Sequence, residues 1–389
     1  MQRAPSPTEP SAQGRFIYVA CPWSPAGGGM FKVADYLISA QLQFNDGDAA
    51  TLRPLDTRGP GSAVASLLFL ALALLRILRG RLSGRLAGVH VNMAERMSIV
   101  RKGSVVATCW LLRVPVIIHL HGEMRTFYGR LPAAAQRLTR WMFSLAAGVV
   151  VIGANGRRFV AEELGVRPER IDVVENGVPG PAVAPVRPDP AERPVHHVLF
   201  VGRMCDPKGV VDLLEGAARA HAGGTALRLT FAGGGEIERY TQLAASLGIA
   251  EITQFAGWCD EDVVRGLLCD ASVLVLPSHD EVLPLVVLEA FAHGVPVICT
   301  PVGELPHVLE DGVHARFVPM RDPEALGAAL RETLADADLL RTLSATGRRT
   351  YEERFSMARF FARIARVHAD RFGTSAGGSA AQTGSEVNA

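Results

Sequence analysis

A proline-rich segment in the middle of the chain is the feature that most constrains its fold. Residues 179–194, PGPAVAPVRPDPAERP, hold six prolines, too many for a helix or a central strand. On each side of this segment, short runs rich in β-branched residues alternate with amphipathic stretches. Each series begins with a strand and a glycine-bearing turn. This alternation predicts an α/β protein of two Rossmann-like, doubly wound domains joined by an extended linker.

The length agrees with two domains, because 389 residues exceed what one hydrophobic core usually supports. Both ends of the chain are rich in small and polar residues and lack core-forming residues. The predicted organisation is a disordered N-terminus at 1–13, a first domain at 14–178, the linker at 179–194, a second domain at 195–353, a C-terminal helix at 354–372 and a disordered tail at 373–389.

The two halves of the chain differ in charge, although the formal net charge is only +1. Residues 1–190 hold 22 Lys and Arg against 13 Asp and Glu, and the remaining residues hold 18 against 26. A basic first half suits an anionic membrane surface or an acceptor that bears phosphate. No nucleic-acid partner is predicted.

The most hydrophobic stretch begins at Ala63, and its uninterrupted apolar run ends at Arg76. This run is shorter than the roughly 18 to 20 residues that span a bilayer. Further arginines follow, so the stretch is either an ordinary core helix or a helix that lies on a membrane. The first residues lack the apolar core of a signal peptide, and the six cysteines form no Cys-x-x-Cys pair. A cytoplasmic protein is expected, with peripheral attachment to the inner face of the membrane left open.

A second informative stretch runs from Pro277 to Glu304, PSHDEVLPLVVLEAFAHGVPVICTPVGE. It predicts a loop after a buried strand, then a helix capped by Ser278 or Asp280 and ended by Gly294. If the helix begins near Glu281, then Glu281 and Glu289 face the same side, because eight residues make just over two turns. Hydroxyl groups of a ribose or a hexose can pair with such carboxylates. Two solvated glutamates on an exposed face are the alternative.

Other candidate residues follow predicted parallel strands, where ligands gather outside the carboxyl ends. In the first half they are Gly27, Gly28 and Gly29, His90 and Asn92, and His121, Gly122 and Glu123. In the second half, Arg203 and Lys208 flank a turn between Gly202 and Gly209. Two cations fixed there can hold a diphosphate, although two solvated basic residues are the alternative. The acidic run Asp260–Asp262 lies at a predicted helix start and indicates capping rather than metal binding.

The pattern G-R-x4-K-G from Gly202, together with PS-x-x-E-x7-E-A-x3-G-x-PV from Pro277, resembles the signature of retaining GT-B glycosyltransferases of family 4, the glycosyl transferases group 1, of the bacterial polysaccharide-assembly type. The resemblance covers about residues 14–372. It implies two domains that face each other across an active cleft, with the C-terminal helix returning to the first domain. It also implies that Arg203 and Lys208 stabilise a departing diphosphate, so that neither a metal ion nor another cofactor is needed.

The same resemblance assigns further roles. Glu281 holds hydroxyls of the donor sugar, Glu289 holds the ribose, and His121 lies beside the donor sugar as a catalytic residue. The remaining donor-binding residues are Gly28, Gly29, Gly202, Val282, Leu283, Leu285 and Gly303. Arg125 and Tyr128 are expected on a mobile acceptor loop, and Glu123 is expected on the acceptor side of the cleft. The chain departs from the family pattern at Val282–Pro284, where glycines are common, and at Glu304 and His307.

The expected activity is transfer of a sugar from a UDP- or GDP-linked donor to an acceptor hydroxyl with retention. The expected acceptor is a polyprenyl-diphosphate-linked saccharide in exopolysaccharide or surface-glycan assembly. A nucleotide-sugar epimerase and a non-catalytic nucleotide-sugar-binding partner are the alternatives. A dehydrogenase is disfavoured, because no acidic residue stands at the right distance after a well-formed GxGxxG.

Overall fold

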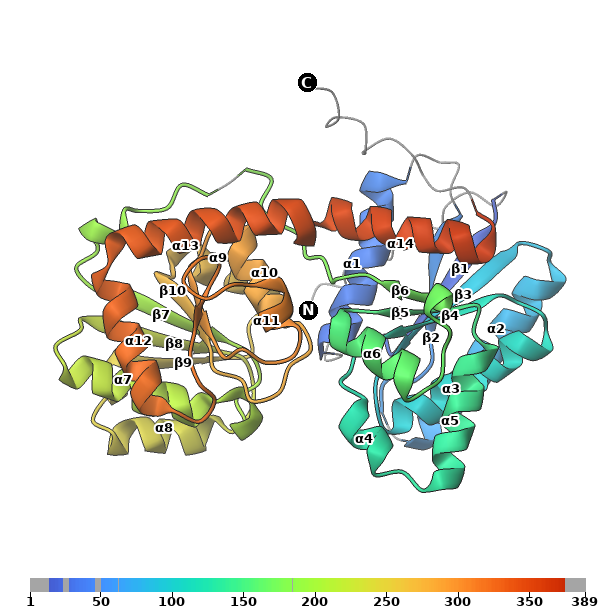
Figure 1. Ribbon diagram of the computed structural model, residues 1–389, viewed down its shortest axis with the longest axis horizontal. Coiled ribbons are helices and arrows are strands. Elements are labelled where there is room, and N and C mark those ends of the chain that lie inside the picture. Colours follow the sequence, from blue (N-terminus) through green and yellow to red (C-terminus); the bar gives the residue numbers. More distant parts are fainter. Residues whose placement is uncertain (1–13, 24–27, 46–49, 62, 184, 375–389) are drawn as a thin grey trace. The chain divides into compact units, whose positions relative to one another are not determined.

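The computed structural model describes residues 14–23, 28–45, 50–61, 63–183 and 185–374. The chain divides into two compact units, each built around its own parallel sheet (Figure 1). Of the described residues, unit 1 holds 14–152, 156–174 and those from Phe361 onward, and unit 2 holds 153–155 and 175–360. The N-terminus predicted as disordered lies outside the described residues, as does the predicted tail from residue 375 on.

Unit 1 contains, in its described part, a six-stranded sheet with the order β2-β1-β3-β4-β5-β6. Every neighbouring pair is parallel. The inner strands β3, β4 and β5 are buried along their whole length, as expected for a parallel sheet covered by helices on both faces. The strands are β1 (Phe16–Cys21), β2 (Thr51–Asp56), β3 (Leu86–Met93), β4 (Val116–Leu120), β5 (Gly148–Val151) and β6 (Ile171–Val173).

The helices of unit 1 follow the strands in the alternation that the sequence predicts. Contacts place α2 beside α3 and α3 beside α5, along one side of the unit (Figure 1). The last helix, α14, begins in unit 2 and continues in unit 1 from Phe361. The helices are α1 (Gly28–Phe44), α2 (Ala63–Leu82), α3 (Met97–Leu111), α4 (Arg125–Gly129), α5 (Ala133–Leu145), α6 (Ala154–Glu162) and α14 (Met357–Phe372).

Unit 2 repeats this plan, with a described sheet ordered β12-β11-β10-β7-β8-β9 and parallel throughout. Its strands are β7 (His196–Val201), β8 (Leu227–Ala232), β9 (Thr253–Gly257), β10 (Val273–Leu276), β11 (Val297–Cys299) and β12 (Arg316–Phe317). Its helices are α7 (Val210–Ala222), α8 (Ile237–Ser246), α9 (Glu261–Asp270), α10 (Leu285–Ala292), α11 (Leu305–Val308), α12 (Pro323–Ala335) and α13 (Ala337–Thr350). The predicted α/β class with two doubly wound sheets is confirmed.

Several local predictions about helix ends and the linker are also confirmed. The Asp260 carboxylate accepts a hydrogen bond of 2.9 Å from the backbone N–H of Val263, so it caps α9. Gly294 follows α10 with φ +64°, which is the left-handed conformation of a helix stop. In the described part of the linker, regular structure is limited to one 3₁₀ turn at Pro190–Glu192.

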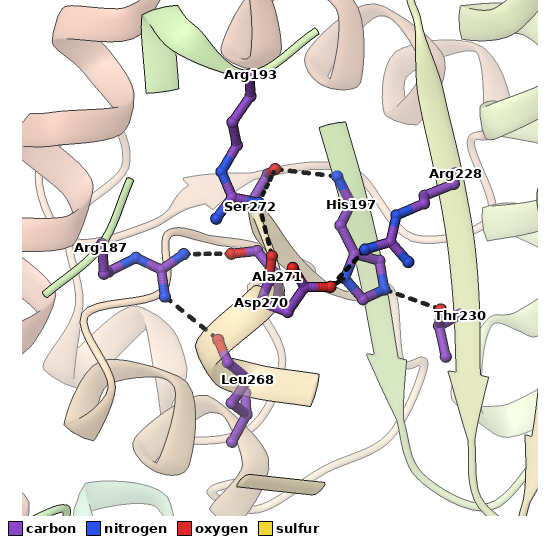
Figure 2. Close-up of polar contacts among 9 residues, drawn as sticks. All are labelled: Arg187, Arg193, His197, Arg228, Thr230, Leu268, Asp270, Ala271 and Ser272. Atoms are coloured by element: carbon purple, nitrogen blue, oxygen red, sulfur yellow. Dashed lines mark hydrogen bonds and ion pairs between the residues drawn. The ribbon is translucent and has the colours of Figure 1, made fainter. Parts of the chain in front are cut away.

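The linker is anchored to the carboxyl end of α9 by arginine side chains. The Arg187 guanidinium donates to the carbonyl oxygens of Leu268, at 3.2 Å, and of Ala271 (Figure 2). Carbonyl groups in the last turn of a helix have no partner within the helix and carry partial negative charge, so a cation suits them. Burial lowers the pKa of Arg187 to about 10, which leaves it charged at neutral pH. Arg193 adds a bond of 2.6 Å to the carbonyl oxygen of Asp270.

We expect Arg187→Met to destabilise unit 2 by about 1.5–3 kcal/mol, because it removes a charged donor from carbonyl groups that the linker covers. Urea unfolding measures this loss. Arg341→Met is the matched control: Arg341 is exposed and pairs with Asp189 of the same linker at 3.0 Å. Such a fully exposed pair contributes little to stability, because water and salt screen it. Equal losses for the two variants would contradict the anchoring role of Arg187.

A chain of buried histidines connects the sheet of unit 1 with α14. Nε2 of His368 lies 2.9 Å from Nδ1 of His90, whose Nε2 lies 3.1 Å from Nδ1 of His119. All three side chains are buried. Burial lowers the pKa of His90 to about 3 and holds the pKa values of His119 and His368 well below their usual range. The prediction of His90 at a ligand-binding edge is therefore wrong, because its ring lies inside unit 1.

These pKa shifts predict that unit 1 loses stability as the pH falls below about 6.5, where unfolded histidine takes up a proton. The folded state keeps His90 neutral down to about pH 3, so the unfolded state binds more protons throughout this window. Each such histidine contributes a loss of about 1.4 kcal/mol per pH unit. Urea unfolding at about pH 7.5 and about pH 5.5, above the range where carboxylates titrate, measures the loss.

His368→Gln is the matched variant for this measurement, because glutamine still offers His90 a polar partner but cannot titrate. In this variant, the free energy of unfolding should fall by about 1 kcal/mol less between the two pH values than it does in wild type. If wild type unfolds at the same urea concentration at both pH values, the buried histidines do not couple stability to pH.

Candidate functional site

The candidate donor site lies at the carboxyl edge of the unit 2 sheet, where the chain leaves β7, β8 and β10. Two of these loops touch through backbone atoms alone. Gly233, after β8, has φ +144°, and a Cβ placed on it would lie 2.0 Å from the carbonyl oxygen of Gly202, after β7. Any residue with a side chain would collide there, so glycine is required for this close approach.

Lys208 is held by the turn that follows β7. It ends a 3₁₀ turn, Asp206–Lys208, and Gly209 follows with φ +68°. A Cβ on Gly209 would lie 2.0 Å from the carbonyl oxygen of Pro277, and the backbone N–H of His279 donates to the carbonyl oxygen of Pro207 at 2.8 Å. The turn after β7 is therefore locked against the loop after β10.

This packing brings together two residues that the sequence analysis predicted for separate roles. The Lys208 ammonium forms an ion pair with the Glu281 carboxylate. The Ser278 hydroxyl donates to the same carboxylate oxygen at 3.1 Å, and the Thr300 hydroxyl donates to the carbonyl oxygen of Ser278. A cation and an anion are thus fixed side by side, one suited to phosphate oxygens and the other to hydroxyl groups. Arg203, which follows β7, is exposed at the same edge.

Gly303 supports the loop that carries Glu281. It has φ +61°, and a Cβ there would lie 2.1 Å from the carbonyl oxygen of Glu281. The next residue, Glu304, donates its backbone N–H to the carbonyl oxygen of Val282 at 2.8 Å. The contact of Gly303 with the donor remains a prediction. The close approach to Glu281 already requires glycine at this position.

Helix α10 begins later than predicted. It starts at Leu285 with Pro284 at the N-cap position, so neither Ser278 nor Asp280 caps it. The expected condition for Glu281 and Glu289 to share a helix face is not met, because Glu281 lies in the preceding loop. Glu289 lies in α10 and is only 8% exposed. Of the predicted loop contacts, Leu283 is buried, and Val282 and Leu285 are partly exposed.

In unit 1, His121 follows β4 and is oriented by Asn92. His121 Nε2 lies 2.7 Å from Oδ1 of Asn92, while Nδ2 of Asn92 faces the carbonyl oxygen of Ala20 at 3.5 Å. The carbonyl oxygen of Ala20 only accepts, so the amide nitrogen belongs on that side and the amide oxygen on the His121 side. His121 Nε2 therefore carries the proton, and Nδ1 is the free acceptor of the neutral ring.

The His121 ring is kept neutral by its surroundings. Burial, followed by the nearby His90 and Lys102, lowers its pKa to about 3. Lys102 is itself buried, and its ammonium donates to the backbone carbonyl oxygen of Asn92. Asn92 and Lys102 were not predicted in these supporting roles, and a buried lysine in an apolar helix is a signal that could have suggested one. His119, two residues earlier, is buried in the sheet.

The predicted acceptor loop is in part a short helix. Arg125 and Tyr128 lie in the short helix α4, and Tyr128 is only 3% exposed. Its hydroxyl accepts a hydrogen bond of 2.7 Å from Nε of Arg140, and Arg125 pairs with Glu163 at 2.9 Å. The prediction of Tyr128 as an acceptor-facing residue of a mobile loop is wrong, because its ring packs in the core. Glu123 is exposed just before this helix.

The predicted glycine loop of unit 1 is described only in part. Gly28, with φ +65°, and Gly29 begin α1 and are exposed, whereas Gly27 lies outside the described residues. Among the described residues, no cluster of three or more His, Cys, Asp or Glu side chains has the arrangement of a metal site. Metal-independent chemistry remains a prediction that rests on Arg203 and Lys208.

We expect Asn92→Asp to raise the pKa of His121, because a carboxylate at the same position stabilises the imidazolium. The pKa is about 3 in wild type, and one new ion pair raises it by about 1–3 units. An NMR titration of the imidazole protons measures the shift. Asn92→Leu, which removes the acceptor without adding charge, is the control and should leave the pKa low. A titration of Asn92→Asp identical to that of wild type would show that Asn92 does not contact the ring.

Two glycosyltransferase family models match this chain. Residues 7–177 match the model described as Glycosyl transferase 4-like domain, and residues 195–336 match Glycosyl transferases group 1. The first match contains His121, and the second contains Arg203, Lys208, Glu281 and Glu289.

Named relatives match parts of the chain. A D-inositol 3-phosphate glycosyltransferase of Geodermatophilus obscurus is 35% identical over 222 residues, which is 53% of this chain and 48% of that protein. The lipopolysaccharide core biosynthesis glycosyltransferase LpsE of Rhizobium meliloti is 34% identical over 167 residues, 43% of this chain and 47% of that protein. The chain thus spans about half the length of the curated relatives it matches.

A solved structure shares the fold over nearly the whole chain. It is Anabaena HepE in complex with UDP and glucose, with a TM-score of 0.71, 15% identity, and coverage of 92% of this chain and 100% of that chain. The likeness shows that the two parallel sheets have the GT-B topology. The two family models together cover most of the sequence, and they show that the chain belongs to the glycosyltransferases that carry a glycosyl transferase 4-like domain followed by a group 1 domain.

Proposed function

We propose that the protein transfers a sugar from a nucleotide-diphospho-sugar to an acceptor hydroxyl with retention of the anomeric configuration. The observation that carries this proposal is the fixed Lys208–Glu281 pair at the glycine-lined edge of the unit 2 sheet. It offers one cation and one carboxylate within the region that matches Glycosyl transferases group 1. A nucleotide-diphospho-sugar carries both groups that such a pair binds, the phosphates and the hydroxyls.

In this proposal the charges of unit 2 act on the leaving group. The C1–O bond to the diphosphate breaks and negative charge builds on the departing oxygen. Lys208 and the exposed Arg203 stabilise that charge, which is a role that positioned cations perform in phosphate chemistry. Charge neutralisation is therefore assigned to side chains rather than to a metal ion. The acceptor oxygen bonds to C1 from the same face, and its proton passes to the leaving phosphate oxygen.

The carboxylates are proposed to position the donor. Glu281 accepts hydrogen bonds from hydroxyls of the sugar, and Glu289 from the ribose. Val282, Leu283 and Leu285 lie on the loop and first helical turn between these glutamates, and their backbone N–H groups are the proposed phosphate donors. Pro284 lacks an N–H, so this loop has one donor fewer than a sequence without proline. His121 keeps its proposed place beside the donor sugar, with Nδ1 as acceptor.

The identity of donor and acceptor is proposed from the relatives and the charge distribution. HepE was solved with UDP, so UDP-linked sugars are the first donors to test and GDP-linked sugars the second. The basic residues 1–190 favour an acceptor that bears phosphate. The relative LpsE is named for lipopolysaccharide core biosynthesis, which supports a lipid-linked saccharide at the cytoplasmic face of a membrane, in surface-glycan or exopolysaccharide assembly. The D-inositol 3-phosphate glycosyltransferase supports a small phosphorylated acceptor as the other candidate.

Calorimetric titration with UDP- and GDP-linked sugars tests the donor site. Lys208→Met should weaken binding of the preferred donor by about 10- to 100-fold, because a charged hydrogen bond contributes about 1.5–3 kcal/mol. Glu289→Gln should weaken it as well. Arg239→Met is the matched control: Arg239 is an exposed cation that pairs with Asp206, in the same turn as Lys208, at 2.9 Å. It should change affinity by less than about 2-fold, in line with the small contribution of a surface ion pair.

Equal affinity of wild type and Lys208→Met for every donor would refute the site. Product analysis then separates the enzyme from its alternatives. Release of nucleotide only when an acceptor is present supports the transferase, release without acceptor supports an epimerase, and tight binding without turnover supports a non-catalytic partner.

A further inference from the structure

Helix α2 packs in the reverse of the usual way. Its buried positions hold mostly small residues, Ser66, Ala73 and Gly80, with Ile77 as the one large buried side chain among its described residues. Gly80 approaches Leu86 so closely that a Cβ would lie 3.2 Å from its side chain. An ordinary surface helix buries its large apolar residues and exposes polar ones. Here most of the leucines are exposed, and only Leu70 and Leu74 pack, partly buried, against the core.

The exposed apolar side chains form a stripe along α2 and continue onto α3 and α5. On α2 they include Leu68, Leu72 and Leu82, which is 77% exposed. The apolar face is defined by Val64, Leu67, Leu68, Leu72, Leu75, Leu78, Leu82, Met97, Val100, Trp110, Leu111, Leu138 and Trp141, all exposed. Singly exposed apolar residues are normal, but a gathering of this size on adjacent helices marks an interaction surface.

Two tryptophans join the neighbouring helices of this face. The rings of Trp110, on α3, and Trp141, on α5, meet edge to face with centroids 6.4 Å apart. Both remain about half exposed. Tryptophan is enriched where protein meets the headgroup region of a membrane, because its ring is apolar and its N–H is polar.

The charged side chains within these three helices are of one sign. No aspartate or glutamate occurs in the sequences of α2, α3 and α5. Exposed arginines flank the leucines and tryptophans: Arg76, Arg79, Arg81, Arg137 and Arg140. Such a surface complements anionic lipid headgroups, while its apolar side chains suit the acyl boundary.

A second copy of the chain suits this face less well. A two-fold interface apposes the same patch from both copies, which would bring arginines against arginines with no acidic residue of these helices between them. Within the described residues, none of the helices combines the length and the apolar character that crossing a bilayer requires. The geometry points to an anionic membrane surface as the occupant, and we propose that α2, α3 and α5 dock unit 1 on it, lying in the interface plane.

The face also reaches the edge of the sheet where unit 1 carries His121. Helices that follow strands of a parallel sheet begin at the carboxyl edge, so Val64 and Leu67, in the first turns of α2, and Met97, at the start of α3, lie toward that edge. A membrane on this face would lie close to the edge that holds His121. The inference extends the lipid-linked acceptor of the proposed function but does not depend on it.

Flotation with vesicles of phosphatidylcholine, with and without phosphatidylglycerol, tests the docking without donor or acceptor. Wild type should float with the anionic vesicles at low salt and dissociate as salt screens the arginines. The triple variant Leu68→Gln, Leu72→Gln, Leu75→Gln should lower the partition coefficient about 10-fold or more, since each leucine loses burial in the membrane. These side chains are exposed, so the fold is retained. Leu42→Gln, on α1 and 86% exposed, is the matched control and should float like wild type.

Tryptophan emission gives an independent readout. Vesicle binding should shift the emission to shorter wavelength, and replacing Trp110 and Trp141 by phenylalanine should abolish the shift although Trp23 and Trp258 remain. The proposal is overturned if wild type ignores anionic vesicles at low salt, or if the triple variant floats equally well. It is also overturned if wild type is a dimer that the triple variant dissociates, because a second copy then covers the face. A failed donor titration leaves these results unaffected, so the two proposals fail separately.

Discussion

The candidate donor site depends on backbone contacts that leave no space for a side chain. At Gly209 and at Gly303, a Cβ would lie 2.0 Å and 2.1 Å from a carbonyl oxygen of the loop that follows β10. Both glycines have positive φ, so the chain turns sharply and close to its neighbour. The loop that carries Glu281 is thereby held between two other loops. The ion pair with Lys208 follows from this packing, since each partner is fixed by its own turn before the side chains meet.

The two units orient their polar side chains in different ways. In unit 2 opposite charges hold each other, and the hydroxyl of Ser278 adds a third contact. In unit 1 the side chains next to His121 are a neutral amide and a lysine that bonds to the backbone. Asn92 orients the ring, and the buried Lys102 donates to a backbone carbonyl oxygen. A neutral histidine can offer an acceptor nitrogen next to a hydroxyl without attracting phosphate. A charged pair, by contrast, suits a site that must bind phosphate and hydroxyl groups together.

The sequence predicts the fold well, because the elements of the fold leave a local signature. The extended backbone of the proline-rich segment, the strand that opens each half and the capping role of Asp260 are all readable from neighbouring residues, and the structure confirms them. What it could not predict depends on contacts distant in the chain. The pairing of Lys208 with Glu281 needs the register of β7 beside β10, and the burial of His90 needs the placement of α14. The burial of Tyr128 depends in the same way on Arg140 of α5.

Helix α2 shows why periodicity alone left two interpretations open. Apolar residues surround this helix, so a hydrophobic pattern does not tell which side packs on the sheet. Close packing decides it: Ala73 and Gly80 are buried with Ile77 on the sheet side, and most of the leucines face outward. In water alone, a row of exposed leucines does not stabilise the protein, because the hydrophobic effect favours moving apolar surface out of water. The same row is stabilising on an apolar partner. The absence of acidic side chains from α2, α3 and α5 favours the anionic surface that we propose as this partner, since a carboxylate within these helices would oppose both the lipid charge and the entry of leucine into the membrane boundary.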